Sequence, residues 1–376
     1  MRIGLIRMRY TPYGGAEVFL SRFIEELRKR GHTLDVFSTE WKESEGMRLH
    51  RIKAAGPKFL RPLLFANAVK KAVEKASPGI VVSLERTDCQ DIYRAGDGCH
   101  REWLIQRGKA VGPAKRFLIK LSPLHRCILA LEKRLFTSPR LKMVVANSRR
   151  VKDEIIRHYG LPEGKICVIY NGVNLADFPA VADPSARLKL RAELGLPADS
   201  TVILYVGSGF ERKGLLYLIR ALKPLKELDA KIKLLVIGKG RTQAYIKEAA
   251  GLGVSDDVIF KGAVKDAVRY YGAADIFALP SIYEPFSNAC LEAMAAGLPV
   301  VTSRVNGASE VITEPVNGAV VEDPTDSAEL ARKIAFFLDS GVREKAGAAA
   351  RQEALKHPIE KNVSEFLGLM EKLIKI

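Results

Sequence analysis

The chain of 376 residues is 47% hydrophobic and 27% charged, a balance typical of folded proteins with a sizeable core. No apolar run approaches the roughly 18 residues that a membrane-spanning helix needs, which argues against an integral membrane protein. The first nine residues contain three arginines and no long apolar stretch, so we expect no signal peptide and a cytoplasmic protein. The five cysteines form no CxxC pair, which predicts reduced thiols.

The net charge of +17 belongs entirely to the first half of the chain. Residues 1–170 contain 34 Lys and Arg against 17 Asp and Glu, whereas residues 171–376 contain 26 of each kind. This asymmetry favours an anionic partner for the first half: membrane lipid, nucleic acid or a phosphorylated substrate. A solvated basic surface that only aids solubility is the alternative.

In the first half, short apolar segments and helical spacing of apolar residues predict an alternation of strands and helices. The predicted strands are residues 3–6, 34–37, 80–84, 143–146 and 167–169. The predicted helices are residues 16–30, 63–75 and 149–159.

The second half alternates more regularly. Its predicted strands are residues 202–206, 233–237, 258–260, 276–279, 300–302 and 319–321. Its predicted helices are residues 215–228, 242–250, 264–271, 289–296 and 328–338. Such alternation is typical of α/β proteins, in which helices cover both faces of a parallel sheet. The Asn171-Gly172 turn, Pro179 and Pro184 place the boundary between the halves near residues 171–185. Two doubly wound halves would bind ligands at the carboxyl ends of their strands, across a cleft.

Three segments follow predicted strands and carry chemistry. The first contains Gly14 and Gly15, where glycine lets the backbone approach a ligand and the next helix offers free N–H groups to an anion. An ordinary glycine turn is an equally good interpretation. The second contains Gly207 and Gly209, followed by Arg212 and Lys213. Two fixed cations there would stabilise the negative charge on a diphosphate leaving group. A solvated basic pair is the alternative.

The third segment, residues 284–292, has glutamates at both ends and is followed by small residues. We expect Pro285 in the first turn of a helix, which leaves the amides of Ser287, Asn288 and Ala289 for a ligand. A carboxylate accepts hydrogen bonds from neighbouring hydroxyls, so Glu292 suits a ribose and Glu284 a sugar ring. Two surface glutamates beside a helix start would be the trivial explanation, and the proline and the small residues make it the weaker one.

Asp97 lies between Gly96 and Gly98, which predicts a tight, exposed loop near a strand end. This carboxylate could bind or deprotonate an acceptor hydroxyl, and an aspartate in a plain turn is as good an interpretation.

Together these segments resemble the retaining glycosyltransferases of family 4, which have the GT-B fold. The resemblance covers nearly the full length and rests on residues 14–17, 30–32, 169–173, 207, 212–214, 284, 292 and 307–310. Residues 9–12, 36–41, 95–97 and 207–210 further resemble the lipopolysaccharide-core glucosyltransferase branch. The resemblance implies two Rossmann-like domains facing each other across a cleft. Residues 1–170 with a C-terminal helix at about 358–376 would form the acceptor side, and residues 171–357 would bind the nucleotide sugar.

The family's functional residues carry over to matching positions. The Gly15 amide meets the donor phosphate, and Arg212 and Lys213 hold the diphosphate. Glu284 holds the sugar with the amides of Phe286, Ser287, Asn288 and Ala289, and Glu292 holds the ribose. Asp97 lies beside the sugar and the acceptor. The remaining donor-binding positions are Gly14, Gly207, and Gly262 to Val264, whose backbone would read the base. The catalytic set would be Asp97, Glu284, Arg212 and Lys213. No Asp-x-Asp motif occurs, so we expect no metal and no cofactor.

Residues 101–134 contain nine Lys and Arg against two Glu, with leucines and other apolar residues at helical spacing that Pro123 divides in two. A basic amphipathic helix can lie on an anionic membrane, and Lys115, Arg116, Lys120 and Arg126 are the candidate lipid-facing cations. In the alternative, the apolar stripe packs on the core and the cations are only solvated; a mixture of the two is our expectation.

These inferences predict a peripheral enzyme on the cytoplasmic face of the inner membrane. It would move a hexose, glucose from UDP-glucose by resemblance, onto a lipopolysaccharide-core or other lipid-linked or phosphorylated glycan. A GT-B sugar-nucleotide epimerase shares the same cleft and stays open. A nucleic-acid-binding protein is disfavoured because few aromatic residues accompany the basic segment. A dehydrogenase is a third alternative, because glycine-containing loops follow predicted strands.

Overall fold

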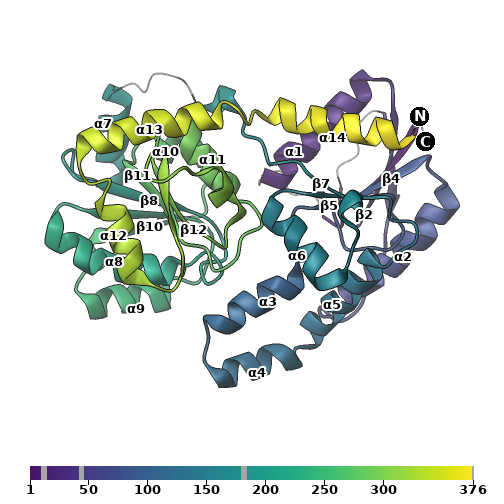
Figure 1. Cartoon of the computed structure of the whole chain (residues 1–376), viewed down its shortest axis with the longest axis horizontal. Coiled ribbons are helices and arrows are strands. Elements are labelled where there is room, and N and C mark those ends of the chain that lie inside the picture. Colours follow the sequence, from purple (N-terminus) through teal and green to yellow (C-terminus); the bar gives the residue numbers. More distant parts are fainter. Residues whose placement is uncertain (10–14, 42–45, 179–183, 375–376) are drawn as a thin grey trace. The chain divides into compact units, whose positions relative to one another are not determined.

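The computed structural model of the chain describes residues 1–9, 15–41, 46–178 and 184–374 (Figure 1). The chain divides into two compact units. Unit 1 consists of Met1–Asn171 and Ile359–Ile376, and unit 2 is Gly172–Pro358. Unit 1 therefore takes its last helix from the far end of the chain.

Unit 1 contains a seven-stranded parallel sheet in the order β3-β2-β1-β4-β5-β6-β7. Its strands are β1 (Arg2–Ile6), β2 (Thr33–Ser38), β3 (Met47–Arg51), β4 (Ile80–Ser83), β5 (Ile92–Ala95), β6 (Met143–Ala146) and β7 (Ile166–Val168). Its α-helices are α1 (Gly15–Lys29), α2 (Arg61–Ala76), α3 (His100–Lys109), α4 (Pro113–Leu121), α5 (Pro123–Phe136), α6 (Arg149–Tyr159) and α14 (Ile359–Ile374). A short 3-10 helix, Glu163–Lys165, precedes β7.

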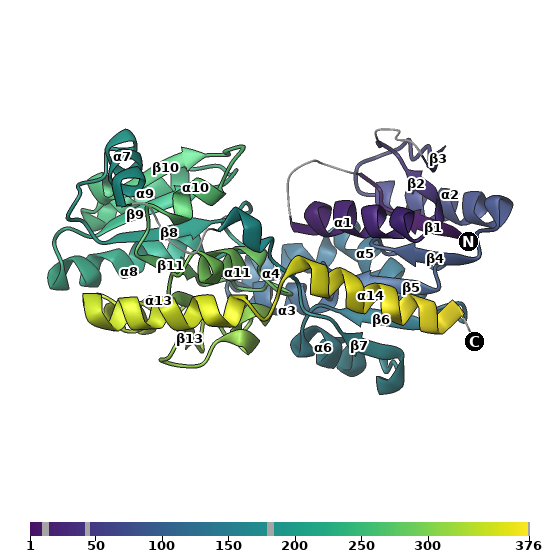
Figure 2. The same cartoon turned by 90° about the horizontal axis from the view of Figure 1, so that it is seen from above.

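Helices cover both faces of this sheet because successive strand residues point to opposite sides. Ile3 and Leu5 of β1 pack with α1 and α14, whereas Ile6 packs with α2. In α1 and α14, Phe23 and Phe366 meet edge to face, with ring centroids 5.1 Å apart. Helices from the two ends of the chain thus share one layer, and both views show them beside the same strands (Figures 1 and 2).

Unit 2 contains a six-stranded parallel sheet in the order β10-β9-β8-β11-β12-β13. Its strands are β8 (Val202–Val206), β9 (Lys233–Ile237), β10 (Val258–Gly262), β11 (Ile276–Leu279), β12 (Val300–Ser303) and β13 (Gly318–Val321). Its α-helices are α7 (Pro184–Leu194), α8 (Leu215–Leu228), α9 (Gln243–Leu252), α10 (Val268–Tyr271), α11 (Asn288–Ala295), α12 (Ser327–Ala335) and α13 (Ser340–Ala354). The 3-10 helices are Leu175–Asp177, Ser255–Asp257 and Gly307–Val311.

The strand order of unit 2 is the 3-2-1-4-5-6 order of dinucleotide-binding sheets, and unit 1 has the same order with one strand more. The predicted α/β class with two Rossmann-like sheets is therefore confirmed. Two strands of unit 1, β3 and β5, were not predicted. Both are short: β3 is an exposed to half-buried edge strand, and β5 carries a buried arginine, Arg94, so neither has the apolar pattern of a core strand.

The basic segment forms three helices where two were expected. Prolines begin two of them: Pro113 opens α4 and Pro123 opens α5. Proline suits the first turn because its missing N–H would have no partner there. The break before α4 also passes through Gly112. Figure 1 shows α3 and α4 extending away from the sheet of unit 1.

Candidate active site

The strongest candidate site lies where the strand order of unit 2 reverses. After β8 the chain continues to β9 on one side, and after β11 it continues to β12 on the other. The two loops that leave these neighbouring strands therefore diverge, and open α/β sheets bind ligands in the resulting crevice. Arg212 and Lys213 follow β8, and Glu284 follows β11, so the sheet brings the two motifs together.

Glu284 receives both cations on one oxygen. Its Oε2 lies 2.9 Å from Arg212 Nη1 and 3.1 Å from Lys213 Nζ. The carboxylate side chain is only 11% exposed, and Arg212 is the most exposed of the three, at 34%. Arg212 Nη1 also donates to the Tyr283 carbonyl at 3.3 Å. The cluster thus has a buried carboxylate at its base and a guanidinium at its open side.

The electrostatics of the cluster favour an ionised glutamate with positive charge to spare. Burial would raise the pKa of Glu284, but Lys213 and Arg212 outweigh burial and hold the pKa below its usual value. At neutral pH two cations therefore share one negative charge. The surplus gives the crevice the sign needed to bind an anion such as a diphosphate.

Glycine is required at two places in the loop after β8. A methyl group at Gly207 would overlap Cδ of Lys213, so the lysine chain lies directly over this residue. Gly214 has a φ of 73°, and a methyl group there would overlap the Pro280 carbonyl. The first glycine lets Lys213 reach Glu284, and the second lets the β8 loop pack on the β11 loop.

Asn306 fixes the loop that carries Glu284. Its Oδ1 accepts hydrogen bonds from the amides of Ser287 at 3.2 Å and Ala308 at 3.1 Å. Its Nδ2 donates to Thr302 Oγ1 at 2.9 Å. The expectation that the Ser287 amide is available to a ligand is therefore wrong, because Asn306 already occupies it.

Helix α11 begins at Asn288, three residues after Pro285. The proline thus lies in the loop, which corrects the prediction that it occupies the first turn. Phe286 is buried before the helix, and Asn288 and Ala289 are half-buried in its first turn. Ser287 is the N-cap residue, although its side chain makes no capping hydrogen bond.

Glu292 lies in α11, and its carboxylate Oε2 accepts a hydrogen bond from the Tyr271 hydroxyl at 2.6 Å. Burial raises the pKa of Glu292, and the hydrogen bond from Tyr271 and the charge of Lys213 only partly offset it. Lys213 therefore acts on the carboxylates of both Glu284 and Glu292, and Tyr271 orients the carboxylate of Glu292.

The other predicted donor positions are spread over both units. Gly262 ends β10, has a φ of 72°, and accepts at its carbonyl from the Gly238 amide at 2.8 Å. Val264 is half-buried in the loop that follows. Gly15 is the first residue of α1 in unit 1. Gly14 lies outside the described residues.

In unit 1, Asp97 lies in the turn after β5, with a side chain that is 68% exposed. The turn is closed by the Gly98 amide, which donates to the Ala95 carbonyl at 3.1 Å, and Gly98 has a φ of 62°. Arg86 fixes this turn through two contacts. Its Nη2 donates to the Gly98 carbonyl at 2.9 Å, and its Nη1 lies 3.9 Å from Asp97 Oδ2. Asp97 is thus a solvent-facing carboxylate on a fixed turn.

Arg86 is in turn held by Glu132 of α5, a fully buried carboxylate. Glu132 accepts from Arg86 Nε at 2.9 Å, from the His100 and Arg101 amides at 2.6 and 3.1 Å, and from the Tyr159 hydroxyl at 2.6 Å. Burial would raise the pKa of Glu132, but Arg86 and these hydrogen bonds hold it below its usual value. This one carboxylate joins α5, the start of α3 and the Asp97 turn.

Arg94 is a second charged residue near this turn. It is a buried residue of β5, and its Nη2 donates to Asn171 Oδ1 at 2.9 Å. Its guanidinium also lies over the Phe19 ring, 4.1 Å from the centroid. Burial lowers the pKa of Arg94 to about 10, which still leaves it protonated at neutral pH.

The basic segment divides its apolar residues between core and surface. On α4, Ile119 is buried, whereas Phe117 and Leu118 are 62% and 66% exposed. Leu131 and Leu135 of α5 are buried. The predicted membrane-surface cations Lys115, Arg116, Lys120 and Arg126 are all exposed. In the described part of the chain, no helix is both long enough and apolar enough to cross a bilayer.

Sequence reasoning assigned no role to Asn306, Tyr271, Glu132 and Arg86, which order the site residues. An Asn-Gly pair after a predicted strand, at Asn306-Gly307, is a turn signal that marks the first. The other three have no local signal, since their partners lie 21 to 46 residues away along the chain.

Two parallel α/β units of this strand order define a protein with two Rossmann-like units, and unit 2 carries a cation-rich cluster at its switch point. Residues 13–177 match the family described as Glycosyltransferase Family 4, and residues 186–353 match Glycosyl transferases group 1. The chain belongs to glycosyltransferase family 4 and has the GT-B fold; it is therefore a glycosyltransferase.

Relatives cover most of the chain at modest identity. An uncharacterized glycosyltransferase of Methanocaldococcus jannaschii is 29% identical, over 85% of this chain and 84% of its own. The lipopolysaccharide glucosyltransferase WaaG of Escherichia coli is 25% identical, over 88% of this chain and 87% of its own.

Solved structures agree on the fold. A crystal structure of WaaG superposes with a TM-score of 0.84 at 23% identity, covering 96% of this chain and 98% of WaaG. HepE from Anabaena, in complex with UDP-glucose, superposes with a TM-score of 0.76 at 21% identity, covering 99% of this chain and all of HepE. The M. jannaschii relative and WaaG are both described as transferases, which favours transfer over epimerisation.

Proposed function

We propose that this protein transfers a hexose from a nucleotide-diphosphate sugar, with UDP-glucose as donor, onto a lipopolysaccharide-core or other lipid-linked glycan. The observation that carries the proposal is the Arg212, Lys213 and Glu284 cluster at the switch point of unit 2. The 25% identical relative described as a lipopolysaccharide glucosyltransferase supports the acceptor class. The complex of HepE with UDP-glucose supports the donor.

The cluster suits the departure of a nucleoside diphosphate. As the bond between sugar and β-phosphate breaks, negative charge builds on the phosphate oxygens, and Arg212 and Lys213 are fixed cations that stabilise it. Glu284 keeps both cations in place and offers oxygen to a sugar hydroxyl. Because the two cations supply the positive charge, the proposed reaction needs no metal ion. Retention of the anomeric configuration is part of the proposal through the resemblance to the family.

Glu292 would accept hydrogen bonds from the ribose hydroxyls while Tyr271 holds its carboxylate. Asp97 would accept the acceptor's hydroxyl proton or orient that hydroxyl, for which its exposure is suitable. The turn under Asp97 is held by Arg86 and Glu132, which are positioning residues.

We further propose that unit 1 works at the cytoplasmic face of the inner membrane. The exposed Phe117 and Leu118 of α4, beside the cations Lys115 and Lys120, form a surface that suits anionic lipid. At about 1 kcal/mol for each Lys or Arg near an anionic surface, a few of these charges would hold the protein there reversibly.

The deciding experiment incubates the purified protein with UDP-, GDP- and ADP-sugars, with and without lipid-linked core glycan, in the presence of EDTA. The expected result is acceptor-dependent release of UDP from UDP-glucose and an α-linked product by NMR. Conversion of the donor to an epimer without acceptor would instead assign epimerase activity. Loss of all turnover in EDTA, restored by a divalent cation, would overturn the metal-free mechanism.

The membrane role has its own measurement, flotation with vesicles at low salt. We expect binding to vesicles that contain phosphatidylglycerol and little binding to pure phosphatidylcholine. Absence of binding to the anionic vesicles would reject the membrane role and leave the transferase proposal in place.

A further inference from the structure

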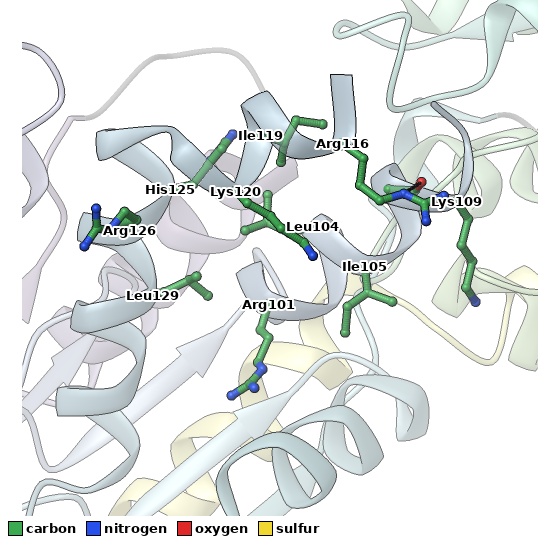
Figure 3. A pocket seen from close by; sticks show the side chains of 11 residues that line it. Arg101, Leu104, Ile105, Lys109, Arg116, Ile119, Lys120, His125, Arg126 and Leu129 are labelled. Carbon is green, nitrogen blue, oxygen red and sulfur yellow. Dashed lines mark hydrogen bonds between the residues drawn. The ribbon is translucent and has the colours of Figure 1, made fainter. Parts of the chain in front are cut away.

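Unit 1 contains a half-open cavity of about 390 Å³ that is separate from the candidate active-site residues. Figure 3 shows it between α3, α4 and α5, and every residue that lines it belongs to one of these three helices. We call it the α3–α5 pocket. None of Asp97, Arg86 and Glu132 lines this pocket, so its lining is distinct from the residues proposed to act on the acceptor.

The inner wall of the α3–α5 pocket is apolar. Leu104 and Ile105 of α3, Ile119 of α4 and Leu129 of α5 contribute it. Ile119 is the buried residue of α4, so the helix that exposes Phe117 and Leu118 elsewhere turns its remaining apolar side into this cavity. The wall offers a hydrocarbon chain a surface away from water.

The edge of the pocket is cationic. Among the residues that the structure describes, its lining includes Arg101, Lys109, Arg116, Lys120 and Arg126, and no Asp or Glu. Figure 3 shows Lys120 extending across the opening beside Leu104, with the other cations around the edge. Arg116 is fixed there, because its Nε donates to the Gly108 carbonyl at 2.8 Å.

Three of these cations carry charge that the protein does not neutralise. Within the described residues, the side chains of Lys109, Lys120 and Arg126 make no hydrogen bond and no ion pair. By contrast, Arg86 and Arg134, in the same unit, are each paired with a carboxylate. Several like charges around an apolar wall repel one another, and a bound anion relieves that repulsion.

Histidine provides the neutral polar group of the wall. His125 lines the pocket, and its Nδ1 lies 3.1 Å from His100 Nε2. Burial lowers the pKa of both rings, that of His100 to about 4. His125 therefore adds an uncharged hydrogen-bonding group to the lining.

From this geometry we infer that the α3–α5 pocket binds a single molecule of a phosphorylated lipid, with one hydrocarbon chain against Leu104, Ile119 and Leu129 and the phosphate at the cationic edge beside Lys120. The inference rests on the proposed membrane role and deepens it: unit 1 recognises an individual lipid phosphate as well as a charged surface. Nucleic acid does not fit, because no Phe, Tyr or Trp among the described residues lines the pocket to stack a base.

The exposed face of α4 and the α3–α5 pocket share the cation Lys120 but use different apolar residues. Phe117 and Leu118 belong to the exposed face and do not line the pocket. Adsorption to a membrane and capture of one lipid can therefore be measured apart.

The test uses dihexanoyl phosphatidic acid below its micelle concentration, titrated into the full-length protein in a calorimeter. We expect saturable binding with one site per chain. Dihexanoyl phosphatidylcholine, which has the same chains but no net charge, and inorganic phosphate, which has no chain, should each bind at least about tenfold more weakly, since each lacks one of the two contacts. Equal binding of phosphatidylcholine, or no saturable binding, would reject the pocket.

Matched variants separate the pocket from the surface. Lys120→Ala combined with Arg126→Ala should weaken phosphatidic acid binding about ten- to thirtyfold, because each lost cation removes about 1 kcal/mol of attraction to the phosphate. Lys71→Ala combined with Lys133→Ala removes two exposed cations of the same unit that do not line the pocket, and should leave this binding unchanged.

The paired variant Phe117→Ser and Leu118→Ser completes the design. It should lose vesicle binding and keep binding of the monomeric lipid. Vesicle binding without monomer binding in the unmodified protein would reject the pocket and keep the membrane role. If the protein binds the monomeric lipid but not anionic vesicles, the lipid site in the pocket is supported and the membrane role of the exposed face of α4 is rejected. Donor turnover, measured in parallel, reports separately on the transferase proposal.

Discussion

The two units share a strand order and use charge in opposite ways. Unit 1 carries the whole excess of positive charge, yet the arginine at its own switch point, Arg86, is bound to the buried carboxylate of Glu132. Unit 2 is nearly neutral, yet Arg212 and Lys213 at its switch point share a single carboxylate. Net charge therefore does not locate the donor site. A local excess of charge at the end of neighbouring strands does, because that is where the fold leaves space for a ligand.

The largest expected effect tests whether Glu132 of unit 1 is structural. Glu132→Gln removes the nearer countercharge of the half-buried Arg86, leaving only the exposed Asp97 at 3.9 Å, and should lower the free energy of unfolding of unit 1 by about 3 kcal/mol. Both tryptophans, Trp41 and Trp103, lie in unit 1, so tryptophan fluorescence in urea follows its unfolding. Glu26→Gln, which removes an exposed ion pair with Lys29, is the control and should cost under about 1 kcal/mol. Equal effects would show that the buried network is not special.

The next effect tests the cluster of unit 2. Lys213→Ala should reduce kcat about 10²- to 10³-fold, because one of two fixed cations facing the leaving group is lost. Lys231→Ala removes an exposed lysine of the same unit, paired with Asp199, and should change kcat less than about twofold. Glu284→Ala should also act mainly on turnover, whereas Glu292→Ala should mainly weaken donor binding. Unchanged kinetics in both glutamate variants would remove the assignment of unit 2 as the donor side.

A smaller effect tests the backbone under the cluster. Gly207→Ala places a methyl group where Lys213 Cδ lies, so the lysine must move away from Glu284. We expect kcat to fall about tenfold with the fold intact, since small displacements of catalytic groups are costly. Gly251→Ala in α9, where a methyl group meets no atom within 4 Å, is the matched substitution and should leave kcat alone. Full activity of Gly207→Ala would mean that Lys213 need not occupy its observed position.

The smallest effect concerns pH. The pKa of Glu292 is raised, so its ionised form, which is proposed to bind the ribose hydroxyls, is lost as pH falls through that pKa. Tyr271→Phe removes a hydrogen bond that favours the ionised form, so the pKa rises further and donor binding weakens at a higher pH than in the unmodified protein. The dissociation constant of UDP measured from pH 4 to 8 reports this shift. Tyr270→Phe is the control, and an identical profile in the two variants would contradict the role of Tyr271.

The sequence by itself determined the class of fold and the order of the motifs. Alternating apolar strands and helices are local patterns, and right-handed crossovers leave few ways to join them, so two parallel sheets followed from the chain alone. Each motif was predicted to follow a strand, and the resemblance to the family assigned Arg212, Lys213 and Glu284 to one donor. The structure added the strand order that makes β8 and β11 neighbours. The strands β3 and β5 were not predicted because their local apolar pattern is weak. They are strands because they pair with β2 and β4 in the sheet.

Only the tertiary structure decided which polar atoms already have a hydrogen-bond or ion-pair partner within the protein. Asn306 takes the Ser287 amide, and Glu132 takes Arg86 from 46 residues away, because buried polar groups must find partners wherever the fold brings them close. The division of the basic segment into a buried Ile119, an exposed Phe117 and an unneutralised Lys120 likewise depends on how α3, α4 and α5 pack. The same helical spacing produces an apolar stripe on a helix that packs on the core and on one that lies on a membrane. Only packing decides which residues of that stripe are buried and which are exposed to solvent.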